Sequence, residues 1–298
     1  AGMLRQRWEV LDPWDSRYYY PNTPRYDSPR AWTCDEHFAV RIPDGIGSMR
    51  PFAYLAEPEV RDNAHWRRLP DSLNPHATAR FIELTHARYD ERLRGEFGET
   101  IRAIFTDEPK VHALRPWTPG MFEAFESQFG YDLRPELWRL FGESDAPRAR
   151  LVRLHYRQWY AERFRACWLK PIAQWCAGHD LPLVGHISPE DDPVEQADAV
   201  GNLMPLQKEL AIPGIDLIVP AVGDHDHPLL NIGIIAARSV CEQQARAGVM
   251  SESLGLTALE ADVPAAKRVL AWQTMMGLTT PVVHGAYESL SGHRAIEA

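Results

Sequence analysis

This sequence of 298 residues has little cysteine and no long apolar run. Its four cysteines lack the spacing of a zinc site and are too few for a disulfide scaffold. No run of about 18 apolar residues appears, so no transmembrane helix is expected. The opening segment, AGMLRQRWEV, has no signal-peptide core. We expect a soluble protein that does not insert into a membrane. Its compartment stays open: cytoplasmic, or secreted or periplasmic if the N-terminus is truncated.

An excess of positive charge and the common nucleotide-binding motifs are also missing. The formal net charge is −9 at pH 7, which argues against nucleic acid and anionic membranes as partners. Neither GxGxxG nor a P-loop motif occurs, so the nucleotide-binding forms of an open α/β sheet lose support. Hydrophobic residues make up 45% of the chain, enough for a sizeable core. These features suit a soluble enzyme with a neutral or cationic ligand.

Five apolar, strand-like segments alternate with amphipathic helical segments after residue 75. Such alternation predicts a parallel sheet covered by helices. Because polar groups stand at nearly every strand exit and nucleotide motifs are missing, we predict an α/β fold of the (β/α)8 TIM-barrel type. In chain order, the predicted strands are IRAIFT (101–106), LPLVGHI (181–187), GIDLIVP (214–220), GVMSES (248–253) and TTPVVHGAYES (279–289).

Residues 1–75 differ in character from the rest of the chain. They are rich in Pro, Trp, Tyr and Arg, as in DPWDSRYYYPNTPRYDSPRAW (12–32), and show no sustained helical or strand period. We predict a loop-rich extension, or a remnant of the first barrel strands, over 1–75 and the catalytic barrel over 76–298. The barrel is therefore expected to be incomplete at its N-terminal strands.

Two helices carry clear start or break signals. Asn74 is a predicted N-cap, with Pro75 at the first helical position of a helix that runs to about Leu93. A long amphipathic helix is predicted to end near Gly178, and Pro171 should kink it or split it in two.

Acidic side chains stand at the ends of two predicted strands. Asp107 and Glu108 follow IRAIFT, and Glu252 lies at the end of GVMSES. If the last predicted strand is the eighth, these carboxylates follow strands four and seven and face each other across the barrel mouth. Many barrel glycosidases use such a pair, one as acid and the other as nucleophile or base. We predict Glu108 and Glu252 as the catalytic pair, without assigning which is the acid; helix capping and pairing with arginine are the structural alternatives.

Other residues near the strand ends are predicted to contact the substrate. His186 could bond a sugar hydroxyl, and Trp117 could stack on a sugar ring, although either could serve packing alone. The acidic loop SPEDDP could bind calcium through its oxygens or simply be solvated, so no metal site is assigned. The predicted substrate-binding residues are Asp107, Trp117, His186, Glu190, His284 and Tyr287, and Glu288 is a spare carboxylate that could replace Glu252.

Several segments together resemble the catalytic barrel of bacterial glycoside hydrolases of the α-L-rhamnosidase type, family 106 and its relatives. They are LNPHATARFIELTHARY, TIRAIFTDEP, RPWTPGMFEAFESQFGYDL, LPLVGHISPED and VMSESLG. The resemblance implies a (β/α)8 barrel that cleaves a terminal deoxysugar with inversion, with calcium helping to hold sugar hydroxyls. Glu108 and Glu252 match acidic positions of the family's barrel motifs. No cofactor is required for the chemistry itself, and the expected partner is a carbohydrate.

Two other functions stay open. One is a metal-dependent barrel hydrolase that uses His186, Asp224, His225 and His227. The other is a degenerate barrel that binds carbohydrate without cleaving it.

The chain stops at HRAIEA, just after the last predicted strand and without a closing helix, so we expect a fragment or a truncated gene. The sequence does not specify the sugar, anomer, linkage or oligomeric state.

Overall fold

The computed structural model describes strands at 9–10, 30–31, 38–41 and 52–55, and the segments 70–111, 116–140, 145–218, 232–255 and 263–284. The chain divides into two compact units, which are described separately. Unit 1 comprises Ala1–Ala77 and Val111–Tyr160, and unit 2 comprises Thr78–Lys110 and Ala161–Ala298. The predicted domains, 1–75 and 76–298, stay a prediction.

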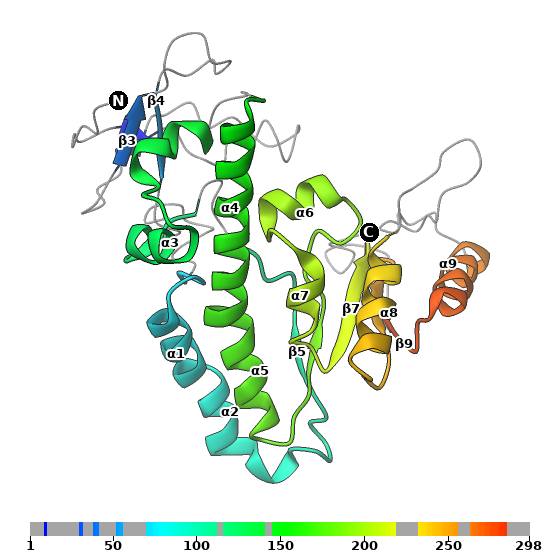
Figure 1. The fold of residues 1–298 in the computed structure, drawn as a ribbon. Coiled ribbons are helices and arrows are strands. Elements are labelled where there is room, and N and C mark those ends of the chain that lie inside the picture. The colour runs from blue at the N-terminus through cyan, green and yellow to red at the C-terminus, as the bar shows by residue number, and fades with distance from the viewer. Residues whose placement is uncertain are drawn as a thin grey trace. The chain divides into compact units, whose positions relative to one another are not determined.

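Unit 2 is built around a parallel sheet whose strands follow one another in chain order (Figure 1). Each lies within a predicted strand or overlaps it. A doubly wound sheet reverses its strand order at a switch point, whereas a barrel keeps the chain order. The described sheet therefore corresponds to a curled half-barrel, which is compatible with part of a (β/α)8 barrel. The strands are β5 (Ile104–Thr106), β6 (Leu183–Gly185), β7 (Ile212–Leu217), β8 (Met250–Ser253) and β9 (Thr280–Val283).

Helices of unit 2 precede β5 or lie between the strands, as the alternating pattern predicts. They are α2 (His86–Leu93), η1 (Arg94–Glu96), η3 (Arg165–Leu169), α5 (Lys170–Ala177), α6 (Pro193–Ala199), α7 (Leu203–Gln207), α8 (Gly233–Gln243) and α9 (Val263–Met276). None of the helices in the described part of the chain has the length and apolar character needed to span a membrane.

The described residues of unit 1 include two short antiparallel strand pairs and two helical segments. The strand pairs are β1 (Glu9–Val10) with β2 (Arg30–Ala31) and β3 (Phe38–Arg41) with β4 (Phe52–Leu55), and the helical segments are α3 (Met121–Phe129) and η2 (Arg134–Leu140). Helices α1 (Pro75–Leu84) and α4 (Pro147–Phe164) each contain residues of both units.

The predicted helix start at Pro75 and the predicted break near Pro171 are confirmed, and the first helix is also interrupted. Helix α1 begins at Pro75, and the side-chain oxygen of Asn74 accepts a hydrogen bond from the backbone N–H of His76 at 3.0 Å. The helix is interrupted at Thr85, and α2 continues to Leu93. The long helix contains the π-helical turn η3 just before Pro171, which has no N–H to donate to the preceding turn.

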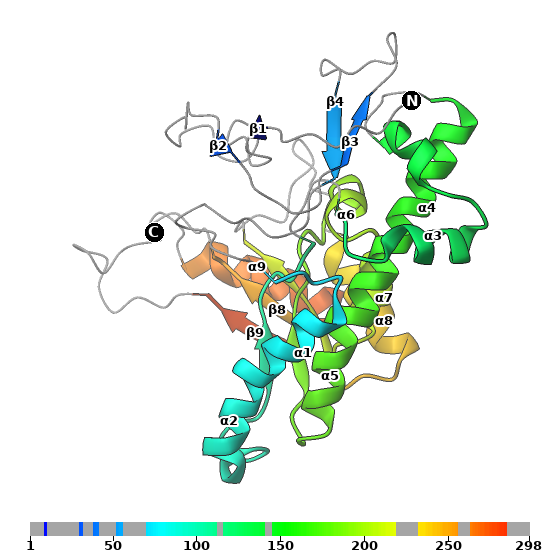
Figure 2. The same cartoon turned by 90° about the vertical axis from the view of Figure 1, so that its left-hand side faces the viewer.

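The two faces of β7 and β8 carry different side chains, and one face packs into the core of unit 2. Ile215 and Leu217 of β7 belong to one buried cluster with residues of α8 and α9. The elements can be followed in Figures 1 and 2. Ser253 of β8 donates to the side chain of Gln273 in α9 at 3.0 Å, so it also faces the helices. Because side chains alternate along a strand, Asp216 and Glu252 point to the other face. They are paired in register on adjacent strands.

Candidate active site

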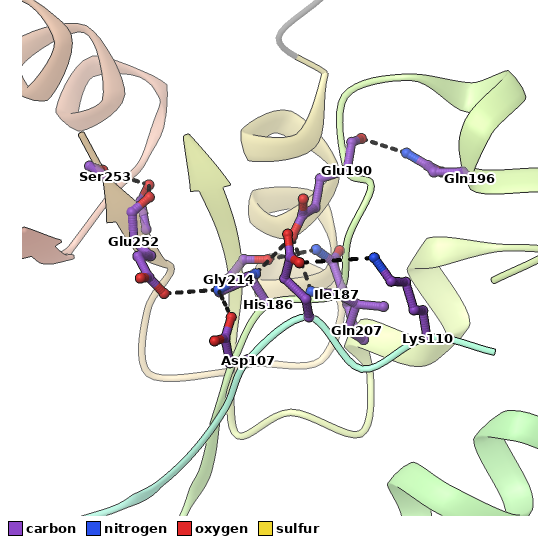
Figure 3. A network of polar contacts seen from close by, with 12 residues as sticks. Asp107, Lys110, His186, Ile187, Glu190, Gln196, Gln207, Gly214, Glu252 and Ser253 are labelled. Carbon is purple, nitrogen blue, oxygen red and sulfur yellow. Dashed lines mark hydrogen bonds and ion pairs between the residues drawn. The ribbon is translucent and has the colours of Figure 1, made fainter. Parts of the chain in front are cut away.

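His186 is the centre of a cluster of carboxylates at the carboxyl ends of the strands (Figure 3). Its ring is fully buried, and Nε2 lies 2.9 Å from Glu252 Oε2 and 3.4 Å from Asp107 Oδ1. On the other side of the ring, Nδ1 lies 3.4 Å from Glu190 Oε1. The structure thus brings together four of the residues singled out in the sequence, from the ends of β5, β6 and β8.

Close packing of the strands below His186 depends on glycine. Gly185 has φ +137°, a conformation that L side chains rarely adopt. A Cβ on Gly185 would overlap the carbonyl oxygen of Thr106 and lie 2.9 Å from its backbone nitrogen. A Cβ on Gly214, in β7, would in turn overlap the carbonyl oxygen of Gly185. The absence of both side chains lets β5, β6 and β7 approach closely and sets the place of His186.

The carboxylates of the loop after β6 accept hydrogen bonds from backbone N–H groups of the protein. Glu190 is 4% exposed, and its Oε1 accepts a hydrogen bond from the N–H of Ile187 at 3.0 Å. Asp191 accepts from the N–H of Gly233 at 2.9 Å. Asp192 caps α6 by accepting from the N–H of Val194 at 2.7 Å. Each carboxylate of the predicted calcium loop therefore has its own backbone partner.

Burial and neighbouring charges shift the protonation of the cluster. Burial lowers the pKa of His186, but its contacts with Glu190 and Glu252 and the charge of Asp216 outweigh this and raise it to about 9. Burial raises the pKa of Glu190 to about 7, against the opposing effect of His186. Between these values His186 is an imidazolium beside an ionised Glu190. The raised pKa of His186 stabilises the fold below about 6.5, and this contribution is lost as the pH rises through about 9.

Asp216 is a member of this cluster that the sequence analysis missed. Its side chain is half-buried, and its Oδ1 has no hydrogen-bond partner among the described residues. Burial raises its pKa to about 7; His186 opposes this rise, and the charges of Glu190, Glu252 and Glu108 add to it. The sequence signal was an aspartate inside the apolar strand GIDLIVP, where burying a charged side chain is costly unless it has a partner or a function.

The raised pKa of Asp216 predicts a stability difference for Asp216→Asn that depends on pH. The folded chain binds a proton here that the unfolded chain releases above its ordinary pKa of 3.8, so wild-type stability falls as the pH rises from about 4 to about 7. We expect the two proteins to be equally stable near pH 4. Above pH 7 we expect the variant to be more stable by about 1–3 kcal/mol, a range reduced for the partial solvation of the side chain.

Urea unfolding at pH 4.5 and pH 8 measures this difference. Asp145→Asn, at an exposed position, is the matched control and should follow the wild type at both pH values. An Asp216→Asn variant that is less stable than the wild type at pH 8 would show that the charged carboxylate is well accommodated.

Glu108 has an unusual backbone conformation at the end of β5. Its φ is +43°, in the left-handed region, which costs a residue with a side chain roughly 1–2 kcal/mol. Its Oε2 lies 4.0 Å from Lys110 Nζ, and about a third of the side chain is exposed. Backbone strain at a carboxylate that reaches solvent is consistent with a functional role for this residue.

The remaining predicted residues are placed differently. His284 follows β9, and its Nε2 lies 3.8 Å from Glu252 Oε1. Trp117 belongs to unit 1 and is 4% exposed, so little of its ring surface is open to solvent. Five residues lie outside the described part of the chain: Asp224, His225, His227, Tyr287 and Glu288.

The family resemblance implies calcium, but the ligands that calcium prefers differ from the side-chain atoms around His186. Asp107, His186 and Glu252 each offer one ligand atom, all within 4.8 Å of one another. Two are carboxylate oxygens and one is an imidazole nitrogen, whereas calcium takes six to eight oxygen ligands. The nitrogen also hydrogen-bonds Glu252, and the raised pKa keeps it protonated at neutral pH. These three atoms by themselves do not match the ligand set of calcium, so calcium stays a prediction, and we treat the cluster as a hydrogen-bonded network.

Comparison with known proteins gives a structural neighbour. No protein-family model matches the chain, and no curated protein matches it. The solved structure of a rhamnosidase from Novosphingobium sp. PP1Y aligns with a TM-score of 0.58 and 21% sequence identity. The two share a fold. The alignment covers 76% of this chain and 21% of the rhamnosidase, so the chain spans about a fifth of that protein's length.

Proposed function

We propose that this chain forms part of the catalytic barrel of a glycoside hydrolase that removes a terminal, α-L-rhamnoside-like sugar. The observation that carries the proposal is the convergence of Asp107 and Glu252 on His186 at the carboxyl ends of parallel strands. In barrel enzymes this end of the sheet holds the catalytic groups. The shared fold with a rhamnosidase supports a distant relationship to glycoside hydrolases.

The proposed chemistry assigns different tasks to two carboxylates. Glycosidic cleavage needs an acid that protonates the leaving oxygen and a carboxylate that acts as base or nucleophile. Glu252 accepts a hydrogen bond from the His186 imidazolium, a contact that orients it and suits the role of base or nucleophile. Glu108, at the end of β5 and beside solvent, is then the proton donor.

Replacing either carboxylate should abolish most of the turnover. We expect Glu108→Gln and Glu252→Gln each to lower kcat by at least about a hundredfold, because Gln can neither transfer a proton nor act as a carboxylate nucleophile. Hydrolysis of a panel of aryl glycosides, α-L-rhamnoside included, measures this. Glu195→Gln, at an exposed position in α6, is the matched control and should keep wild-type turnover.

Two results would contradict the proposal. Unchanged turnover in either variant would remove that residue from the mechanism. A folded wild type that binds sugar but hydrolyses no glycoside would instead favour a carbohydrate-binding barrel without catalysis. Circular dichroism of each variant separates loss of chemistry from loss of folding.

A further inference from the structure

The surroundings of Glu190 differ from those expected of a residue that binds a sugar. Its side chain is 4% exposed, so hardly any of it is open to a sugar in solvent. Its Oε1 is held by the N–H of Ile187 at 3.0 Å, and the side chain of Gln196 bonds its backbone carbonyl. The carboxylate is therefore held by one backbone N–H and the main chain of Glu190 by Gln196, and the carboxylate faces Nδ1 of His186 at 3.4 Å.

His186 is the only link between Glu190 and Glu252 among the described contacts of this cluster. Its ring lies edge-on to Phe105, with centroids 5.7 Å apart, so packing as well as hydrogen bonding limits its rotation. Nδ1 makes no hydrogen bond to a described residue, and Glu190 Oε1, 3.4 Å away, is its ion-pair partner when the ring is protonated. On the opposite side of the ring, Nε2 is hydrogen-bonded to Glu252 at 2.9 Å. The titratable groups that face the ring are Asp107 just after β5, Glu190 from the loop after β6, Asp216 from β7 and Glu252 from β8.

We propose that Glu190 is a positioning residue: it holds His186 so that Nε2–H is directed at Glu252, and thereby fixes the orientation of the Glu252 carboxylate. The catalytic consequence rests on the proposed function; the effect on His186 does not. A carboxylate that pairs with the second nitrogen of a histidine favours the doubly protonated ring and restrains its orientation. Glu190 thus acts through another residue rather than on the sugar.

The direct test follows His186 by NMR in protein with 15N-labelled histidine, with His186→Gln used to assign its signals. In the wild type we expect both ring nitrogens to be protonated at pH 7.5 and the ring to titrate near pH 9. Glu190→Gln keeps the shape and an acceptor for the Ile187 N–H but removes the charge, so we expect the pKa of His186 to fall toward its ordinary value of 6.5. Glu195→Gln should leave the titration unchanged.

Kinetics on the same variants test the consequence for Glu252. We expect Glu190→Gln to lower kcat by about tenfold with KM within about twofold, because orientation of a catalytic group is lost and substrate binding is not. We also expect the alkaline limb of the kcat profile to move to lower pH, together with the titration of His186. A residue with a merely structural role would not move this limb.

The outcomes separate the two proposals. A His186 titration that is the same in wild type and Glu190→Gln overturns the positioning role, whatever the activity. A rise in KM of tenfold or more with unchanged kcat would make Glu190 a sugar ligand. If the wild type hydrolyses no glycoside, the proposed function fails and the NMR titration alone decides the role of Glu190. If Glu190→Gln does not fold, Glu190→Asp shortens the reach to His186 and should also lower its pKa.

Discussion

Replacing His186 by alanine is expected to destabilise the folded chain by about 3–5 kcal/mol near pH 7.5. The substitution leaves the carboxylate of Glu190 buried without its cationic neighbour, and it leaves a cavity where the ring packs. Glu252 loses its 2.9 Å hydrogen bond at the same time, so turnover should also be lost. Urea unfolding monitored by circular dichroism measures the loss in free energy of unfolding.

A double variant distinguishes lost charge pairing from lost packing. In His186→Ala with Glu190→Gln, no uncompensated charge remains at position 190, so we expect at least about half of the lost stability to return. The interaction free energy from the double-mutant cycle should then be favourable for the wild-type pair. Additive effects of the two substitutions would mean that His186 and Glu190 do not stabilise each other.

Gly185→Ala is expected to be at least as damaging, by a different physical cause. The added Cβ would overlap the carbonyl oxygen of Thr106, a backbone atom that cannot move aside as the end of a side chain can. The φ of +137° adds strain of about 1–3 kcal/mol for any residue with a Cβ. We expect a loss of about 3 kcal/mol or more in the free energy of unfolding, or failure to fold, because β5 and β6 must separate.

Gly95→Ala is the matched control for this prediction. Gly95 lies in η1, and an added Cβ would meet nothing within 4 Å. We expect its stability to stay within about 0.5 kcal/mol of the wild type. A Gly185→Ala variant with wild-type stability and a wild-type His186 titration would mean that the strands can separate without disturbing the cluster.

Much of the half-barrel could be predicted from the sequence because its signals are local. Short apolar runs bounded by proline, glycine or polar residues predict strands, and β5 to β9 lie at these runs. Asn74 and Pro75 mark the start of α1 for the same reason: capping needs only neighbouring residues. The π-helical turn η3 and the interruption at Thr85 were not predicted in detail, since both depend on how the helices pack.

The candidate site was predictable only in part. Residues at strand ends, such as Asp107 and Glu252, could be named because the carboxyl ends of parallel strands meet at one edge of a sheet. Asp216 was missed because it lies inside an apolar strand, where the alternation of faces decides its role. The burial of Glu190 behind His186 depends on the path of a loop, which residue patterns do not specify.

The spacing of the strands along the chain has a consequence for how the protein folds. Segments 186–211, 218–249 and 254–279 connect β6 to β9, whereas the much longer segment 107–182 separates β5 from β6. Closing a longer loop costs more entropy, and contacts distant in sequence form more slowly. We therefore expect β6 to β9 to assemble first and β5 to join them late. Since Asp107 and Glu108 directly follow β5, the folding intermediate should contain His186 and Glu252 but no complete set of carboxylates.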